Sequence, residues 1–341
     1  MMISWLPFDH ALVALLPVLG FLTLLLLLDS YKLIRPTAVL AVLAAGVVAA
    51  FASYLVSLFA LGPAGLSVAS YSHFAAPLAE ELLKGLVIVW LTRAHRIGFL
   101  VDAAILGFAV GSGFALVENL AYLRLASEAG LSTWIVRGFG PAVMHGGATA
   151  ILAVLGLSVL ERRPDAGPGA FLPGLALAAM LHAGFNQLIA WPQLATLATL
   201  VVVPALLLVV FHHSEKALAQ WLGSGFDADT QMLGLIHSGQ FSGSPSGQYL
   251  QTLRHALSGP MMADALCYLR LYTELALRAK GLLMMREHGL PEPPIDAATR
   301  AGLEELKFLE RSIGPTGLRA LRPLLHMRRK ELWQLYLLQS G

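Results

Sequence analysis

Long apolar runs constrain this chain more than any other feature of its sequence. A helix needs about 20 mostly apolar residues to cross a bilayer. About seven runs meet this need, near residues 11–28, 38–61, 73–92, 100–123, 134–160, 171–190 and 194–211. Because lipid offers backbone polar groups no partner, such runs must fold as helices or a closed barrel, and their length favours helices. We therefore predict an all-α polytopic membrane helix bundle of about seven transmembrane helices.

Charged residues are scarce and unevenly distributed. Only 13% of the residues are charged, against about 25% in an ordinary soluble domain. Residues 1–211 contain nine Lys or Arg and nine Asp or Glu, which leaves fourteen and twelve for residues 212–341. This contrast predicts a transmembrane domain over residues 1–211 and a soluble helical domain over residues 212–341.

The second domain has the sequence of flexible connections followed by helices. Gly223-Ser-Gly225 and residues 241–247 are rich in Gly and Ser, which is typical of linkers. Apolar residues at helical spacing predict helices near 248–258, 260–289, 297–313 and 317–338. We find no catalytic motif here, and a cytoplasmic protein partner for this domain is a hypothesis.

Basic residues between the runs predict an orientation. Alternate connections contain Lys32, Arg35, Arg93, Arg96, Arg162, Arg163 and Lys216. The opposite connections contain only Arg124 and Arg137, which we interpret as contacts for lipid head groups. The N-terminus is therefore predicted outside and the C-terminus in the cytoplasm. A net charge of +2, with no stripe of basic and aromatic residues, argues against a nucleic-acid partner.

Four groups of polar side chains interrupt the apolar runs. They are Glu80, Glu81 and Lys84 in the third run, Glu118 and Asn119 in the fourth, His145 in the fifth, and His182 and Asn186 in the sixth. An ionisable group inside hydrocarbon costs about 2.5–3.5 kcal/mol on insertion scales, so each group suggests a function. With the predicted orientation, all four lie in the outer half of the bilayer. A shared depth favours one site over scattered structural contacts.

Helical geometry adds detail to two of these groups. Lys84 lies on the helix face between Glu80 and Glu81, so it can neutralise one carboxylate while the other shares or holds a proton. Pro77 precedes this pair and is expected to kink the helix. His182 and Asn186 are four residues apart and share a face.

Taken in order, these motifs resemble a known family. Glu-Glu-x-x-Lys from Glu80, Phe-x-x-x-Glu-Asn from Phe114, a lone His in the next run and His-x-x-x-Asn closely resemble the PrsW-type intramembrane proteases, distant relatives of the CAAX prenyl endopeptidases. The resemblance covers about residues 70–190. The CAAX branch usually has Arg at position 85 and His at position 118, whereas this chain has Gly85 and Glu118, which favours the PrsW branch.

The resemblance implies both an activity and a site. It implies an intramembrane endopeptidase of the bacterial inner membrane, described as metal-dependent. Its substrates would be membrane-anchored proteins, anti-sigma factors among them. The implied catalytic residues are Glu80, Glu81, Glu118, His145 and His182, with Lys84, Asn186 and Asn119 in support.

The chemistry of peptide hydrolysis suggests a role for each group. We expect Glu80 or Glu81 to take a proton from water, and His182 and Asn186 to stabilise the oxyanion. Glu118 and His145 would position the water or bind a metal. A metal set of Glu81, Glu118, His145 and His182 would suit Zn²⁺. No His-Glu-x-x-His pair is present, so a mechanism that uses carboxylate and imidazole alone stays open.

Two other classes of function compete with proteolysis. Buried Glu, Lys and His side chains also form proton relays in transporters, so a proton-coupled transporter is the alternative. Transporters often contain inverted repeats, and we detect none in this sequence. A membrane receptor or scaffold with a cytoplasmic output domain is the third class.

Overall fold

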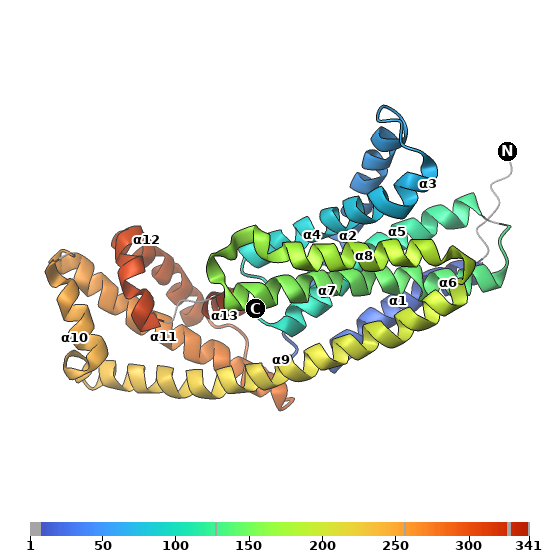
Figure 1. The fold of residues 1–341 in the computed structure, drawn as a ribbon. Coiled ribbons are helices and arrows are strands. Elements are labelled where there is room, and N and C mark those ends of the chain that lie inside the picture. Colours follow the sequence, from blue (N-terminus) through green and yellow to red (C-terminus); the bar gives the residue numbers. More distant parts are fainter. Residues whose placement is uncertain (1–7, 127, 256, 326–328, 340–341) are drawn as a thin grey trace. The chain divides into compact units, whose positions relative to one another are not determined.

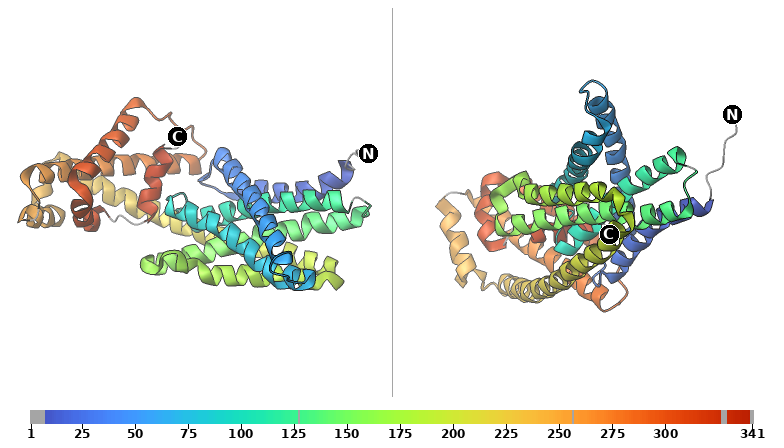
Figure 2. Two further views of the ribbon diagram at one scale, coloured as in Figure 1. Left: turned by 90° about the horizontal axis from the view of Figure 1, so that it is seen from above. Right: turned by 45° about the vertical axis from the view of Figure 1, so that its right-hand side comes forward.

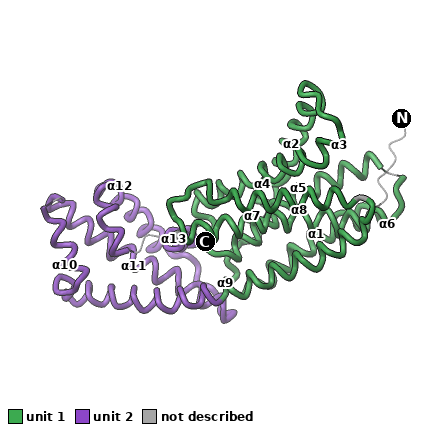
Figure 3. Tube along the Cα trace, viewed as in Figure 1, with its two compact units in different colours: residues 1–215 green, residues 216–341 purple. Residues whose placement is uncertain are grey.

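The computed structural model describes residues 8–126, 128–255, 257–325 and 329–339 (Figure 1). Nearly all of these residues are helical, and none of them forms a β-strand. The all-α prediction is confirmed. The chain divides into two compact units, residues 1–215 and residues 216–341 (Figure 3).

The first unit is a bundle of long helices joined by short turns. Its α-helices are α1 (Phe8–Leu28), α2 (Pro36–Leu61), α3 (Val68–Ser70), α4 (Ala76–Arg93), α5 (Leu100–Leu125), α6 (Leu131–Phe139), α7 (Pro141–Arg162), α8 (Leu172–Gln187) and the first part of α9 (Pro192–His237). A π-helical turn, η1 (Tyr71–Ala75), precedes α4. Two 3₁₀ segments, η2 (Pro164–Phe171) and η3 (Leu188–Ala190), flank α8.

Six helical segments of the described residues are long and apolar enough to cross a membrane. They are Asp9–Leu28, Pro36–Leu61, Leu100–Leu125, Leu131–Arg162, Pro164–Gln187 and Pro192–His237. The remaining predicted run, 73–92, forms η1 and α4, which contain Glu80, Glu81 and Lys84 and are therefore less apolar. That α4 crosses the membrane stays a prediction.

Helix α5 lies at the centre of this unit. Residues 101–115 of α5 are all buried, and the helix packs along α7 and α2, as the views in Figure 2 also show. Small residues permit this close approach. A Cβ atom on Gly111 would lie 2.2 Å from the carbonyl oxygen of His145, so only glycine fits this crossing of α5 and α7.

The fifth predicted span differs from the prediction because it contains two helices. Pro141 begins α7 and has no N–H with which to continue α6, and the chain turns at Gly140. Helix α6 is therefore a separate helix that packs on α1. Trp134 of α6 is fully buried between α1 and α5 residues, beside Ala14 and Leu123.

The turn before α4 also differs from the prediction. Pro77 lies in the first turn of α4, directly after the π-helical turn, so the irregular backbone precedes Glu80 and Glu81. The backbone N–H of Ala76 donates a π-helical hydrogen bond to the carbonyl of Tyr71. This bond sets the backbone register immediately before Pro77. In that register residue 77 would bond the Ser72 carbonyl, but Pro77 has no N–H. The side-chain nitrogen of Asn186 supplies the donor instead, at 3.0 Å.

The second unit is a helical domain with its own apolar core. It contains the rest of α9, η4 (Phe241–Gly243), α10 (Pro245–Thr252), η5 (Leu253–His255), α11 (Gly259–Glu287), α12 (Ala297–Leu325) and α13 (Arg329–Gln339). Leu269, Leu275, Leu306 and Ile313 belong to the core cluster. Helix α12 breaks at Gly314, where φ is +70°, before Pro315. The predicted final helix, 317–338, is divided between α12 and α13, and residues 326–328 lie outside the described residues.

The predicted linker at Gly223-Ser-Gly225 is wrong, because these residues are helical within α9. A Cβ atom on Gly225 would lie 2.8 Å from the Nζ atom of Lys280. Gly225 thus leaves room for the Lys280 side chain to reach Asp229, 2.5 Å away, and the ring of Trp221. Glycine at this position allows α9 and α11 to pack closely. In the sequence alone, such a glycine looks the same as one in a flexible linker.

Candidate active site

Four helices of the first unit bring the predicted polar residues into one cluster. Glu80, Glu81 and Lys84 come from α4, Glu118 from α5, His145 from α7, and His182 from α8. Contacts between side chains connect all six of these residues. The structure thus places together all five residues that the sequence suggested for catalysis.

Glu81 is the most enclosed carboxylate of the cluster. It is fully buried, and its Oε1 atom lies 2.6 Å from Nζ of Lys84 and 3.0 Å from Nδ1 of His182. Its Oε2 atom accepts a hydrogen bond from Thr149, at 3.5 Å. Lys84 is also fully buried. A buried carboxylate with this many donors is held as a fixed negative charge rather than left free to react.

His145 joins Lys84 to Glu118. Its Nδ1 atom lies 3.1 Å from Nζ of Lys84, and its Nε2 atom lies 2.7 Å from Oε2 of Glu118. Because a protonated lysine only donates and a carboxylate only accepts, we assign the ring proton to Nε2. The ring of His145 also packs against Phe114 and, edge to face, against His182, with centroids 5.1 and 4.7 Å away.

Glu80 differs from the other two carboxylates because it makes no hydrogen bond within the described part of the chain. Its nearest charged contact is Nε2 of His182, 3.8 Å from Oε2, which is too long for a hydrogen bond. Its side chain is 18% exposed. The cluster contains three carboxylates and, with Lys84 and Arg137, two cations. Glu80 is therefore the carboxylate without a fixed cation at short range. A proton or a metal ion would neutralise its negative charge.

The donor atoms fit a divalent metal. Glu80, His145 and His182 each offer one ligand atom, and these atoms lie within 4.8 Å of one another. One carboxylate and two imidazoles are a common protein ligand set of catalytic zinc. The metal ligands predicted from the sequence include both of these histidines. The two carboxylates of the predicted set are engaged, Glu81 by Lys84 and Glu118 by Arg137, whereas Glu80 is available. His145 is engaged as well, so an ion would have to replace Lys84 at Nδ1 or Glu118 at Nε2.

The two predicted supporting asparagines hold helices together rather than touching the carboxylates. Asn186 donates to the Ser72 carbonyl and so attaches α8 to η1, the turn before α4. Asn119 donates to the carbonyl of Ala14 in α1, at 2.8 Å, and accepts from Nε of Arg137 in α6, at 3.2 Å. In this arrangement the Asn186 nitrogen is engaged by Ser72, so it is not aimed at a reacting carbonyl.

Arg137 is the member of the cluster that the sequence interpretation missed. Instead of lipid head groups, it contacts Glu118, with Nη2 3.2 Å from Oε1, and lies 3.6 Å from the ring centroid of Tyr122. No spacing signal marked it, because the break at Gly140 separates α6 from the helix of His145. Helix α6 was predicted as the outer end of a continuous span, where a basic residue is ordinary.

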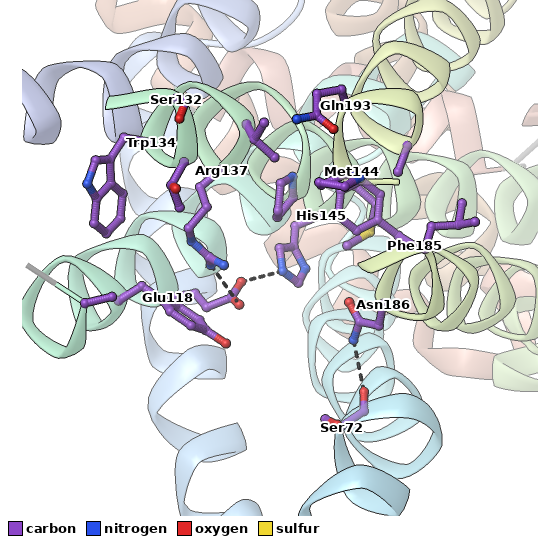
Figure 4. Close-up of a pocket in the computed structure, with 18 of the residues that line it drawn as sticks. Ser72, Glu118, Ser132, Trp134, Arg137, Met144, His145, Phe185, Asn186 and Gln193 are labelled. Carbon is purple, nitrogen blue, oxygen red and sulfur yellow. Dashed lines mark hydrogen bonds and ion pairs between the residues drawn. The ribbon is translucent and has the colours of Figure 1, made fainter. Parts of the chain in front are cut away.

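A pocket of about 580 Å³ opens beside this cluster (Figure 4). Glu118, Arg137 and His145 form its polar wall, and Met144 and Phe185 are among its apolar lining residues. Figure 4 shows Arg137 and His145 reaching Glu118 from opposite sides. A pocket that reaches Glu118 and His145 of the cluster offers water and substrate a place to bind.

Comparison with known families agrees with this arrangement. The sequence profile of the PrsW family intramembrane metalloproteases matches residues 31–211, more than half of the chain. The chain belongs to the PrsW family. No curated protein matches the sequence, and no solved structure matches it.

Membership in the PrsW family settles the class of this protein. It is an integral membrane protein and an intramembrane protease, and the transporter alternative is not favoured. The matched region contains the whole cluster and the pocket residues described above, whereas the second unit lies beyond it. The PrsW description as metalloproteases agrees with the Glu-His-His donor set.

Proposed function

We propose that this protein hydrolyses peptide bonds of membrane-anchored proteins near the outer leaflet, with Glu80, Glu81, Glu118, His145 and His182 as the reaction centre. The observation that carries the proposal is Glu80. It is a carboxylate inside a helix bundle, without a hydrogen bond within the described residues, beside two imidazoles. Such a group is costly to keep unless it reacts or binds a cation.

Glu80 and Glu81 take different roles in this proposal. Glu80 accepts the proton of the attacking water, because its oxygens are the ones not already engaged. Glu81, fixed by Lys84, accepts from Nδ1 of His182 and thereby orients that ring. A neutral His182 with its proton on Nδ1 turns the lone pair of Nε2 toward Glu80. This favours His182 as a ligand or base over its predicted role as an oxyanion donor.

The residues that would hold a metal are Glu80, His145 and His182, and we propose zinc because this donor set suits it. A bound zinc ion would supply Lewis acidity toward the scissile carbonyl. A carboxylate has two oxygens, so Glu80 can contact an ion through one and accept a proton through the other. Lys84 contacts Nδ1 of His145 and Glu118 contacts Nε2, so a bound ion would take the place of one of these two partners.

Substrate and orientation extend the proposal. The basic residues favour an outside N-terminus and a cytoplasmic second unit, which places the pocket on the outer side. A regulatory substrate, such as a membrane-anchored anti-sigma factor of the bacterial inner membrane, fits that geometry. The domain division follows as a protease-like domain over residues 1–211 and a cytoplasmic helical domain over 212–341 that binds a protein partner. Descent shared with the CAAX endopeptidases is part of the same proposal.

The test is cleavage in liposomes against a panel of single-span substrates. Glu80→Gln and His182→Ala are expected to lower the cleavage rate at least about 100-fold, the usual contribution of an acid–base group. Glu128→Gln, an exposed carboxylate outside the cluster, is the matched control and should cleave at the parent rate. Folded and inserted Glu80→Gln protein that cleaves at the parent rate would overturn the proposal, as would solute flux without cleavage.

A further inference from the structure

Arg137 makes three contacts with a single stretch of α5. Its Nη2 atom donates to Glu118 at 3.2 Å, its Nε atom donates to Asn119 at 3.2 Å, and its guanidinium lies 3.6 Å from the ring centroid of Tyr122. The side chain is 16% exposed and lines the pocket. A planar guanidinium suits this set, because it donates in fixed directions and stacks on aromatic faces.

The rest of α6 is built to hold that side chain in place. Trp134, one turn before Arg137, is fully buried, and its indole nitrogen donates to the Ala129 carbonyl at 3.1 Å. Gly138 follows Arg137 and packs so closely on α1 that a Cβ atom there would lie 2.1 Å from the Val13 carbonyl oxygen. Two anchored neighbours leave Arg137 little freedom to leave Glu118.

Glu118 transmits this constraint to His145. Its two oxygens are divided between the two partners, Oε1 with Arg137 and Oε2 with Nε2 of His145. Without Arg137, Oε1 would lose its donor and Glu118 its nearest cation, and the carboxylate would be free to rotate. Carboxylates that orient a reactive histidine commonly alter activity about 10–100-fold when they are disturbed.

We propose that Arg137 is a positioning residue of this protease: it fixes Glu118 and, through Glu118, the ring of His145. The inference rests on the proposed function, since it gives His145 a place in the reaction. It assigns to α6 the task of presenting a guanidinium to the site. The competing interpretation is a structural clip between α6 and α5, which would affect stability but not the chemical step.

Kinetics on a cleaved substrate separate these two interpretations. Arg137→Ala is expected to lower kcat about 10–100-fold with KM within about twofold of the parent. Arg137→Lys keeps the charge without the planar fork and should give an intermediate kcat. Because the side chain lines the pocket, added guanidinium should restore part of the kcat of Arg137→Ala. Arg124→Ala is the matched control, since Arg124 is exposed and does not line the pocket.

A second measurement does not depend on activity. Diethyl pyrocarbonate modifies unhindered histidine nitrogens, and site-resolved mass spectrometry can follow His145 alone. In the parent, the ring is buried and Nε2 is covered by Glu118. Arg137→Ala should accelerate modification of His145, and Arg124→Ala should not. The folded fraction of each variant is measured in parallel by size-exclusion chromatography and thermal unfolding.

The outcomes are distinct. Unchanged kcat and unchanged His145 modification in folded Arg137→Ala protein would overturn the inference. So would a fall in kcat that neither Arg137→Lys nor guanidinium restores and that follows the loss of folded protein. If the parent cleaves no substrate, the proposed function fails, and the modification rate of His145 still decides whether Arg137 positions that ring.

Discussion

Glu80 and Glu81 are neighbours in sequence with the same side chain, yet the fold gives them opposite environments. Glu81 faces Lys84, His182 and Thr149 and is fully buried. Glu80 has no hydrogen bond within the described residues and is partly exposed. An offset of about 100° around α4 is enough to separate a structural anion from an available one.

The buried pair of Lys84 and Glu81 gives the first prediction at the residue scale. Removing one partner of a buried ion pair costs about 3–5 kcal/mol, since the other charge is left without compensation. Lys84→Met should therefore lower the free energy of unfolding by that amount. Adding Glu81→Gln should recover most of the stability but no cleavage. Thermal unfolding in detergent measures the first effect and the liposome assay the second. Lys216→Met, at an exposed site, is the control and should change neither.

Two buried tyrosines of the second unit give a prediction for alkaline pH. Burial, and then the Glu310 carboxylate, raises the pKa of Tyr268, and burial with Glu331 raises the pKa of Tyr272. A raised pKa in the folded state means that the stabilising contribution is complete below about pH 10, where an unfolded tyrosine titrates, and is lost above it. Unfolding should therefore become easier as the pH rises above 10.

Tyrosinate absorbance and thermal unfolding of the whole protein, measured across that pH range, test this prediction. Tyr268→Phe removes one of the two groups and should make the alkaline loss of stability shallower. Tyr54→Phe removes an exposed tyrosine of α2 and should leave the alkaline transition unchanged. An alkaline transition with the same steepness in Tyr268→Phe would contradict the assignment.

Close packing of α5 on α7 is the feature that matters at the scale of the element. Gly111→Ala would bring a Cβ atom within 2.2 Å of the His145 carbonyl oxygen, so the backbone that carries His145 must move. Such overpacking costs about 1–3 kcal/mol, and the displacement should lower cleavage as well. The same substitution at Gly20 in α1 meets no atom within 4 Å and is the control. Parent-like cleavage by Gly111→Ala would show that the site tolerates movement of α7.

How much the sequence could predict also depends on the element. Glu80, Glu118, His145 and His182 could be found because each polar residue stood within an apolar run and recurred at helical spacing or matching depth. Arg137 could not, since it lies on a short helix that the sequence merges with the next. The pairing of Asn186 with Ser72 was equally hidden, because it depends on a π-helical register before Pro77. Gly225 shows the converse, since a glycine that serves packing looks like one that serves flexibility.

Metal dependence is a property of the whole molecule, because its three proposed ligands come from three helices. Treatment with a zinc chelator is expected to abolish cleavage and to lower the unfolding temperature, and added Zn²⁺ should restore both. Glu80→Gln should retain less zinc by elemental analysis than Glu118→Gln does, since Glu80 is the proposed ligand. Full cleavage by metal-free protein would instead support the mechanism that uses carboxylate and imidazole alone.

The pocket beside His145 also sets the supply of the second reactant. Its volume of about 580 Å³ is far larger than the space one water molecule needs, so it has room for several. A bound peptide segment would displace most of them, while each turnover consumes one. The rate of hydrolysis should therefore depend on how much of the pocket the substrate fills, as well as on the reacting groups. A substrate that fills the pocket completely would exclude the water that cuts it, so the best substrates are those that bind well and still leave room beside His145.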